Sequence, residues 1–265
     1  MNSYHLSILA ILALFFSACT EVIEIEADQA DSKVVIEATL TNTPLNNQVI
    51  LTQSAGFYET GSYPRISDAI VKVIDEQGTE VQLTESEEGV YQSDGWIGQA
   101  DQVYQLQVEV QGETYGGLSY LPEPIQLDSL SYMYESGSPF REAGFVPTVY
   151  FSSDRPESDT YVRFFIRHNG RLLRQYDLYN GNQPRGEGGS ISFFQNSFAS
   201  GDTLQIIAAS IDKSVYDYYF QLAEITGNGA GPGAAAPSNP TSNLSNDALG
   251  YFGAMGISVM EEILP

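Results

Sequence analysis

The sequence has very few residues of the kinds that most enzymes and metal sites use. It contains one cysteine and two histidines in 265 residues. One cysteine excludes an intrachain disulfide framework and any metal site built from several cysteines. Histidine is the usual source of acid–base and zinc chemistry near neutral pH, so two histidines leave little room for either. The composition therefore predicts a protein that is not an enzyme and that uses no cofactor and no metal.

Positive charge is equally scarce. The chain has 11 Lys and Arg against 34 Asp and Glu, which gives a formal net charge of −23. Binding to a phosphate backbone requires a clustered basic surface, which so few cations cannot supply. Nucleic acid is therefore excluded as a partner, although the chain is long enough to bury a substantial core.

Long apolar runs are also missing, apart from one at the N-terminus. Residues 6–16 (LSILAILALFF) are apolar, but the run is too short to span a bilayer and has the length of a signal-peptide core. Ser17 and Ala18 then precede Cys19, and small residues ahead of a cysteine resemble a bacterial lipobox. In a lipobox the chain is cut before the cysteine, and its thiol carries a diacylglycerol.

The alternative is an ordinary signal peptide followed by an incidental buried cysteine. The only cysteine stands where cleavage would place it first, so we predict a signal peptide at residues 1–18, lipidation of Cys19 and a short acidic tether at 19–32. Several acyl chains on one residue are enough for stable anchoring. The sequence thus predicts a cell-envelope lipoprotein held to the outer membrane through its lipid anchor, on either the periplasmic or the external face.

Beyond the tether, short alternating segments rich in β-branched residues recur about every ten residues. Such spacing without a helical period predicts a β-sandwich of immunoglobulin-like or transthyretin-like kind. The expected strands of the first half are 33–41, 49–54, 69–75, 79–83, a strand starting at 89, 104–110 and 113–120. Those of the second half are 125–134, 148–151, 161–168, 171–179, 190–194, 203–211 and a closing strand at 248–260.

Two further patterns organise the chain. Pro122 and Pro124 cannot both join a central strand, so they predict a boundary between an N-terminal sandwich at 33–121 and a C-terminal β-rich domain at 125–265. A helix is expected at 213–226, where apolar and aromatic residues share one face and Asp212 can cap the start. The expected fold is mainly β, with two β-sandwich domains and one helix near the C-terminus.

Several segments, in their order along the chain, resemble one protein family. They are CTEVIE at 19–24, KVVIEA at 33–38, AIVKV at 69–73, GVY at 89–91, YQLQV at 104–108, PSNP at 237–240, SNL at 242–244 and ALGYFGA at 248–254. Their order resembles a family of Bacteroidota lipoproteins known as domain of unknown function 4249 (DUF4249). The resemblance implies an outer-membrane lipoprotein, often encoded beside a TonB-dependent receptor, and it implies no catalytic residues.

The motifs that suggest chemistry have simpler interpretations. The glycine-rich segment 227–233 lacks the Lys and Ser/Thr of a phosphate-binding loop and is interpreted as a surface loop. His168 abuts the Asn169-Gly170 turn and is interpreted as a surface histidine at a turn, not as a member of a catalytic triad. The acidic clusters at 85–88 and 154–159 lack the spacing of a calcium loop, so they are interpreted as solvated loops.

Aromatic residues in predicted loops are the more suggestive feature. Phe57, Tyr58, Tyr63 and Trp96 could stack on sugars or form an interface, or they could instead fill the ends of the sandwich core. Two short sequences, Asp-Ser-Leu around Ser129 and Asp-Thr-Leu around Thr203, resemble bacterial O-glycosylation sites.

Three functional hypotheses follow. The first is a non-catalytic lipoprotein that acts as an accessory or binding partner of a TonB-dependent receptor or a similar envelope complex. The second is a surface protein that captures an oligosaccharide or peptide through its aromatic loops. The third is a hydrolase, which would need paired carboxylates that the sequence does not mark.

Overall fold

Strands dominate the fold, as the alternating pattern predicts. The computed structural model describes residues 32–44, 47–55, 63–93, 95–138, 142–154, 159–181, 189–226 and 238–265. The predicted signal peptide, Cys19 and the tether up to residue 31 lie outside the described residues. The described residues belong to one compact unit. No helix among them is long and apolar enough to cross a membrane.

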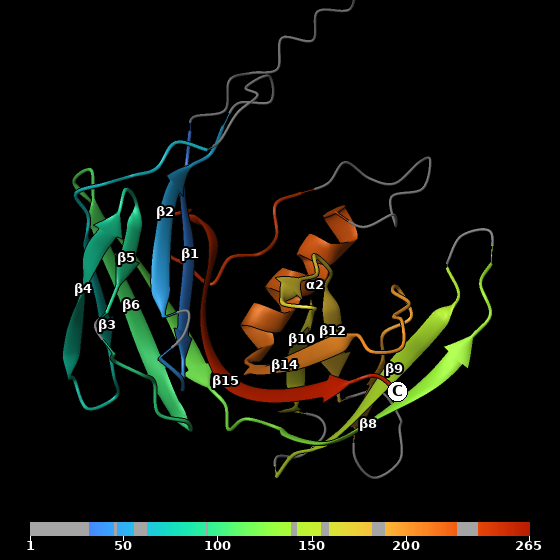
Figure 1. The fold of residues 1–265 in the computed structure, drawn as a ribbon. Coiled ribbons are helices and arrows are strands. Elements are labelled where there is room, and N and C mark those ends of the chain that lie inside the picture. The colour runs from blue at the N-terminus through green and yellow to red at the C-terminus, as the bar shows by residue number, and fades with distance from the viewer. Residues whose placement is uncertain are drawn as a thin grey trace, which may run out of the picture. The chain divides into compact units, whose positions relative to one another are not determined.

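The N-terminal strands form two layers, drawn in blue to green in Figure 1. They are β1 (Val34–Thr41), β2 (Gln48–Gln53), β3 (Ile70–Ile74), β4 (Glu80–Glu87), β5 (Val90–Gln92), β6 (Gln102–Val110) and β7 (Glu113–Leu121). The order β1-β2-β5-β4-β3-β6-β7 is continuous because β4 pairs with β5 through one half and with β3 through the other. Alternate residues of these strands point into a shared core, as Ile36, Leu51 and Leu106 show by their complete burial.

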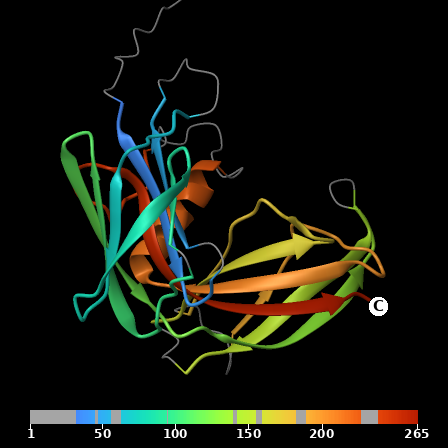
Figure 2. The same cartoon turned by 60° about the vertical axis from the view of Figure 1, so that its left-hand side comes forward.

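The C-terminal strands form a second pair of layers. They are β8 (Gln126–Glu135), β9 (Gly144–Ser152), β10 (Tyr161–His168), β11 (Arg171–Leu172), β12 (Asp177–Asn180), β13 (Gly189–Ser192), β14 (Thr203–Ile211) and β15 (Leu249–Ile263). A three-stranded sheet in the order β13-β9-β8 packs its inner face against β10 and β14 (Figure 2). Phe164, which lies on β10, contacts Phe151 of β9 and Phe193, with ring centroids 5.4 and 6.0 Å apart.

Helix α2 (Lys213–Thr226) has the bounds predicted from its sequence. Asp212 caps it, since the Val215 N–H donates to Asp212 Oδ1 at 3.0 Å. Val215 and Tyr219 face the outer side of β14 and pack on Ala209 and Ile211. The helix therefore covers the face of this sheet that lies opposite the β13-β9-β8 layer.

The strand β15 belongs to both layered regions. Its residues 249–255 pair in parallel with β1, and its residues 256–263 pair in antiparallel fashion with β14. Gly250 has φ +95° and Gly256 lies against the carbonyl of Pro122, where a Cβ would be 2.3 Å from the oxygen. Only glycine fits both positions. The predicted boundary at residues 121–125 stays a prediction, but β15 joins the sheets on its two sides.

Most predicted strands are confirmed within two residues of their bounds. The Asn169-Gly170 hairpin turn is confirmed too, with φ of 48° and 82° at its two central residues. Three strands are longer than expected, since β4 extends to Glu87, β9 begins at Gly144 and β15 extends to Ile263. One expectation is wrong: residues 171–179 were expected to form one strand, whereas β11 ends at Leu172 and β12 begins at Asp177. Tyr176, in the interruption, lies beside the Arg163 guanidinium instead of continuing the ladder.

Candidate functional site

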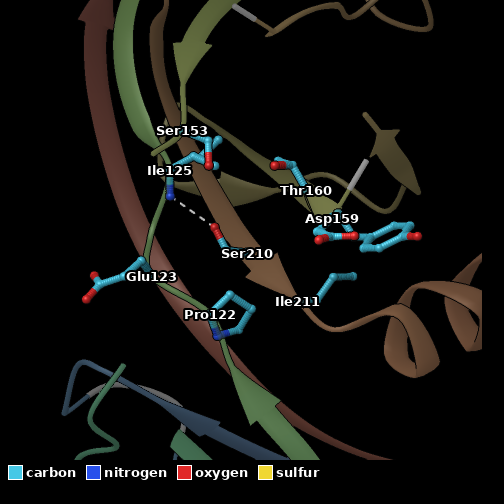
Figure 3. A pocket seen from close by; sticks show the side chains of 9 residues that line it. Pro122, Glu123, Ile125, Ser153, Asp159, Thr160, Ser210 and Ile211 are labelled. Atoms are coloured by element: carbon cyan, nitrogen blue, oxygen red, sulfur yellow. Dashed lines mark hydrogen bonds between the residues drawn. The ribbon is translucent and has the colours of Figure 1, made fainter. Parts of the chain in front are cut away.

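A small, partly enclosed hollow lies where the segment 122–125 passes the ends of β10 and β14 (Figure 3). Serine hydroxyls fix the backbone of this segment on both sides. The Ile125 N–H donates to Ser210 Oγ at 3.0 Å, and Ser258 Oγ donates to the Ile125 carbonyl. The hollow has a volume of about 10 Å³, which is roughly the space that one water molecule needs.

A wider and more open depression of about 200 Å³ adjoins this hollow. The residues that line it are Tyr120, Asp159, Tyr161, Ile211, Asp212 and Lys213. Lys213 is occupied by an ion pair with Asp217 at 2.6 Å, and this carboxylate raises the pKa of Lys213. Glu123, on the rim of the enclosed hollow, points away from Asp159 (Figure 3).

Asp212 is committed to structural hydrogen bonds. Its Oδ1 accepts from the Val215 N–H and from Ser214 Oγ, at 3.0 and 2.6 Å. Its Oδ2 accepts from Ser119 Oγ at 2.6 Å and from the Tyr120 N–H at 3.1 Å. A carboxylate with four donors already in place is poorly suited to act as a general base. This residue ties α2 to β7, and among the described residues that line the depression its carboxylate accepts no hydrogen bond from a nucleophile other than the Ser119 and Ser214 hydroxyls.

Tyrosines gather under α2 around a cation. The Arg163 guanidinium lies 3.8 Å from the ring centroid of Tyr219, 4.3 Å from that of Phe165 and 5.1 Å from that of Tyr176. Burial raises the pKa of Tyr218 to about 12, and it raises the pKa of Tyr219 well above the ordinary value. These phenols stay neutral at physiological pH. The abundance of tyrosine is thus partly explained by a core that holds an arginine through cation–π contacts.

Only two of the four aromatic residues predicted to form a binding site lie among the described residues. Phe57 and Tyr58 lie outside the described residues. The side chain of Tyr63 is 63% exposed, as a binding residue would be. Trp96 is half-buried against the N-terminal core and packs edge-to-face on Tyr104, with ring centroids 5.8 Å apart. Among the described residues no contact joins Tyr63 to Trp96, so the structure does not bring these two together.

The two predicted glycosylation positions lie on different strands. Ser129 is exposed on β8, beside a bulge that displaces Asp128. Thr203 begins β14, and its backbone N–H donates to Asn169 Oδ1 at 2.9 Å. Modification of either hydroxyl remains a prediction.

His168 ends β10 next to the turn, where the sequence places it. Its Nε2 lies 2.8 Å from Asp202 Oδ2, and its ring packs edge-to-face on Phe198. Hydrogen bonds from Asn169, and then from the Ala199 N–H, lower the pKa of Asp202. No serine, threonine or cysteine of the described residues donates to His168. Nowhere among the described residues does a group of three or more His, Cys, Asp or Glu lie close enough together to hold a metal ion.

Sequence reasoning missed the exposed side chains of the β8–β9 hairpin. Tyr132, Met133 and Tyr134 of β8 are 37%, 60% and 63% exposed, and Tyr150 of β9 is 44% exposed. The rings of Tyr132 and Tyr134 lean edge-to-face on Phe145. The strand itself was predicted, but its position at the edge of a sheet depends on distant pairings that no local pattern records.

Comparisons with known proteins add a family and no activity. No curated protein matches the chain. Among solved structures, the chain is similar to the crystal structure of the chicken interferon gamma receptor alpha chain, at 12% identity over 67% of this chain and 88% of the receptor chain, with a TM-score of 0.23. A sequence profile of a domain of unknown function, DUF4249, matches residues 20–260. The chain therefore belongs to the DUF4249 family.

Proposed function

We propose that the mature protein is a non-catalytic lipoprotein of the outer membrane that binds another protein of the cell envelope. The partner we propose is a TonB-dependent receptor, for which the lipoprotein acts as an accessory subunit. The observation that carries the proposal is the set of exposed apolar side chains on the β8–β9 hairpin, with Tyr132 and Tyr134 on one face of the sheet and Met133 and Tyr150 on the other. Large exposed aromatic side chains are typical anchors of protein interfaces.

The anchoring part of the proposal rests on Cys19. The family profile starts at residue 20, directly after this cysteine, which suits a mature chain that begins at residue 19. The net charge of −23 would keep the folded part away from anionic headgroups. A chain held by lipid and repelled from the headgroup surface leaves its hairpin accessible to a neighbouring protein.

The test is co-purification from the native membrane. The protein, crosslinked in intact cells and captured in mild detergent, is expected to bring down an outer-membrane receptor in fixed proportion. The intact mass of the captured chain is expected to show acyl chains on Cys19. A Cys19→Ser variant is the control, because it should leave the membrane fraction and lose the receptor together. Capture with no receptor, from a correctly lipidated chain, would refute the accessory role.

A further inference from the structure

The edge strands of this fold are protected in different ways, and β8 differs from all the others described. The outer edge of β7 is covered by residues 243–246, since the Ser245 N–H donates to the Gly116 carbonyl at 2.7 Å and the Gly116 N–H donates to Ser245 Oγ at 2.8 Å. The outer half of β15 carries two adjacent glutamates, Glu261 and Glu262. The other described edges, β11, β12 and β13, are only two to four residues long.

By contrast, β8 is ten residues long and lies at the end of its sheet. Between Asp128 and Glu135 it has the sequence SLSYMY, which contains no charge, proline or glycine. Natural proteins usually blunt a long exposed edge with lysine, proline or a covering segment. The bulge at Asp128 is the single such feature here, and it stands near the start of the strand.

Strand pairing shows which backbone groups of β8 face outward. The Phe193 N–H donates to the Pro147 carbonyl, so residue 147 directs its backbone polar groups toward β13. Its opposite residue on β8, Tyr132, therefore directs its N–H and C=O away from β9. The alternation of a strand gives the same direction to Leu130 and Tyr134. No backbone of the described residues pairs with these three positions.

The same three residues share one side-chain face. Leu130, Tyr132 and Tyr134 stand opposite Val149, Pro147 and Phe145 of β9. The two tyrosine rings are supported by Phe145, with centroids 6.1 and 5.4 Å apart. An added strand could therefore pair with the outward backbone groups of β8 and pack its side chains on the two tyrosine rings beside them. Extended peptides that join a sheet edge bind through this combination of contacts.

We propose that β8 binds an extended segment of another protein as an additional strand, and that this segment carries basic residues at both ends of an uncharged stretch. The inference rests on the proposed function and names the surface and the chemistry through which the partner is bound. Acidic residues flank the uncharged stretch, with Asp128 at one end and Glu135 and Glu142 at the other. Basic residues on the incoming strand would lie against them.

Charge also selects against a second copy of the chain. Every copy carries a net charge of −23, and antiparallel pairing of two β8 strands would bring Asp128 of one toward Glu135 of the other. Like charges facing each other across paired strands are destabilising. A partner with basic flanks gains from the same residues that repel a copy.

The test uses two synthetic peptides as probes, KKTVTVTVKK and EETVTVTVEE, and the purified mature chain in mild detergent. The basic peptide is expected to bind at least tenfold more tightly than the acidic one, by fluorescence anisotropy, with the difference shrinking at high salt. It is also expected to slow amide hydrogen exchange at Leu130, Tyr132 and Tyr134 by tenfold or more. Equal binding of the two peptides, or unchanged exchange at these amides, would overturn the inference. So would protection that rises with protein concentration in the absence of peptide, since that identifies a second copy as the occupant.

Variants separate this edge from the rest of the surface. Tyr132→Pro removes an outward N–H without breaking a bond to β9 and is expected to weaken binding of the basic peptide at least tenfold, whereas Tyr132→Phe keeps the N–H and the ring and should bind normally. Asp128→Lys leaves the strand ladder intact and is expected to shift preference toward the acidic peptide, which keeps the test decisive if the proline variant does not fold.

The two proposals can fail separately. If the basic peptide binds β8 but no receptor co-purifies from membranes, the edge site stands and the receptor partnership fails. If a receptor co-purifies equally well with the wild type and with Tyr132→Pro, the partnership stands and the edge site fails.

Discussion

Replacing Asp212 should weaken the whole fold, because one carboxylate joins α2 to β7. Asp212→Ala removes the acceptor for four donors: the Val215 and Tyr120 N–H groups and the hydroxyls of Ser214 and Ser119. Loss of an N-cap costs about 1 kcal/mol. Loss of a charged acceptor for a buried donor costs about 1.5–3 kcal/mol, and Ser119 is only 3% exposed.

Ser119 also holds the last strand in place. Its Oγ accepts from the Ala254 N–H at 2.9 Å, so the hydroxyl links β15 to Asp212. The summed cost predicts that Asp212→Ala lowers the free energy of unfolding by about 2.5–4 kcal/mol. Asp212→Asn keeps an N-cap acceptor but loses the negative charge, so it is expected to lower the free energy of unfolding by only about 1 kcal/mol.

The assay is urea unfolding at pH 7, followed by both circular dichroism and Trp96 fluorescence. Asp217→Ala is the matched control, since its carboxylate forms only an exposed i,i+4 ion pair with Lys213 and should cost no more than about 0.5 kcal/mol. If Asp212→Ala is no less stable than Asp217→Ala, the Asp212 carboxylate does not stabilise the fold by joining α2 to β7.

Three further outcomes are expected. Phe164→Ala should lower the free energy of unfolding by about 3–5 kcal/mol, because the ring is completely buried; the control Phe220→Ala, whose ring is 46% exposed, should cost about 1 kcal/mol or less. Burial raises the pKa of Asp177, so the folded state favours its protonated form, and stability is lost as pH rises through that raised pKa. Asp177→Asn should therefore be more stable than wild type at pH 7 and equal to it in acid, and stability profiles that do not converge in acid would contradict the assignment. Hydrogen bonds lower the pKa of Asp202, so its contribution is present above the ordinary carboxyl range and lost as pH falls through the lowered pKa. Asp202→Asn should be less stable at neutral pH with a flatter acid limb in thermal melts, and an unchanged acid limb would count against it.

Local pattern was sufficient for much of the secondary structure. Residues 213–226 carry their helix signal within the segment, in the spacing of the aromatic face and in the cap at Asp212, and the helix has those bounds. The turn at Asn169-Gly170 was predictable because both residues tolerate positive φ, which the turn requires. In each case the deciding interactions join residues within about four positions of one another.

Long-range pairing was not predictable in the same way. The sequence indicates a strand near residue 248, but nothing in it says that Leu249 pairs with Val35 in parallel or that the same strand then pairs with β14. The candidate surface depended on such pairing too. Tyr132 and Tyr134 are exposed because β8 has a neighbour on one side only. Trp96 lies in a loop, as expected, but its ring packs on Tyr104.

The two-sided pairing of β15 has a consequence for the order of folding. The core that includes Ile36 and Leu51 also includes Ala248, Phe252 and Ala254. Until residues 249–255 have been synthesised, β1 therefore pairs with β2 alone and lacks its second neighbour, and contacts this distant in sequence form slowly. In an exported chain, this delay would keep the N-terminal half from locking into its native state while the rest is still crossing a membrane. Completion of the first sheet therefore depends on β15, which is synthesised long after the β1 strand that it joins.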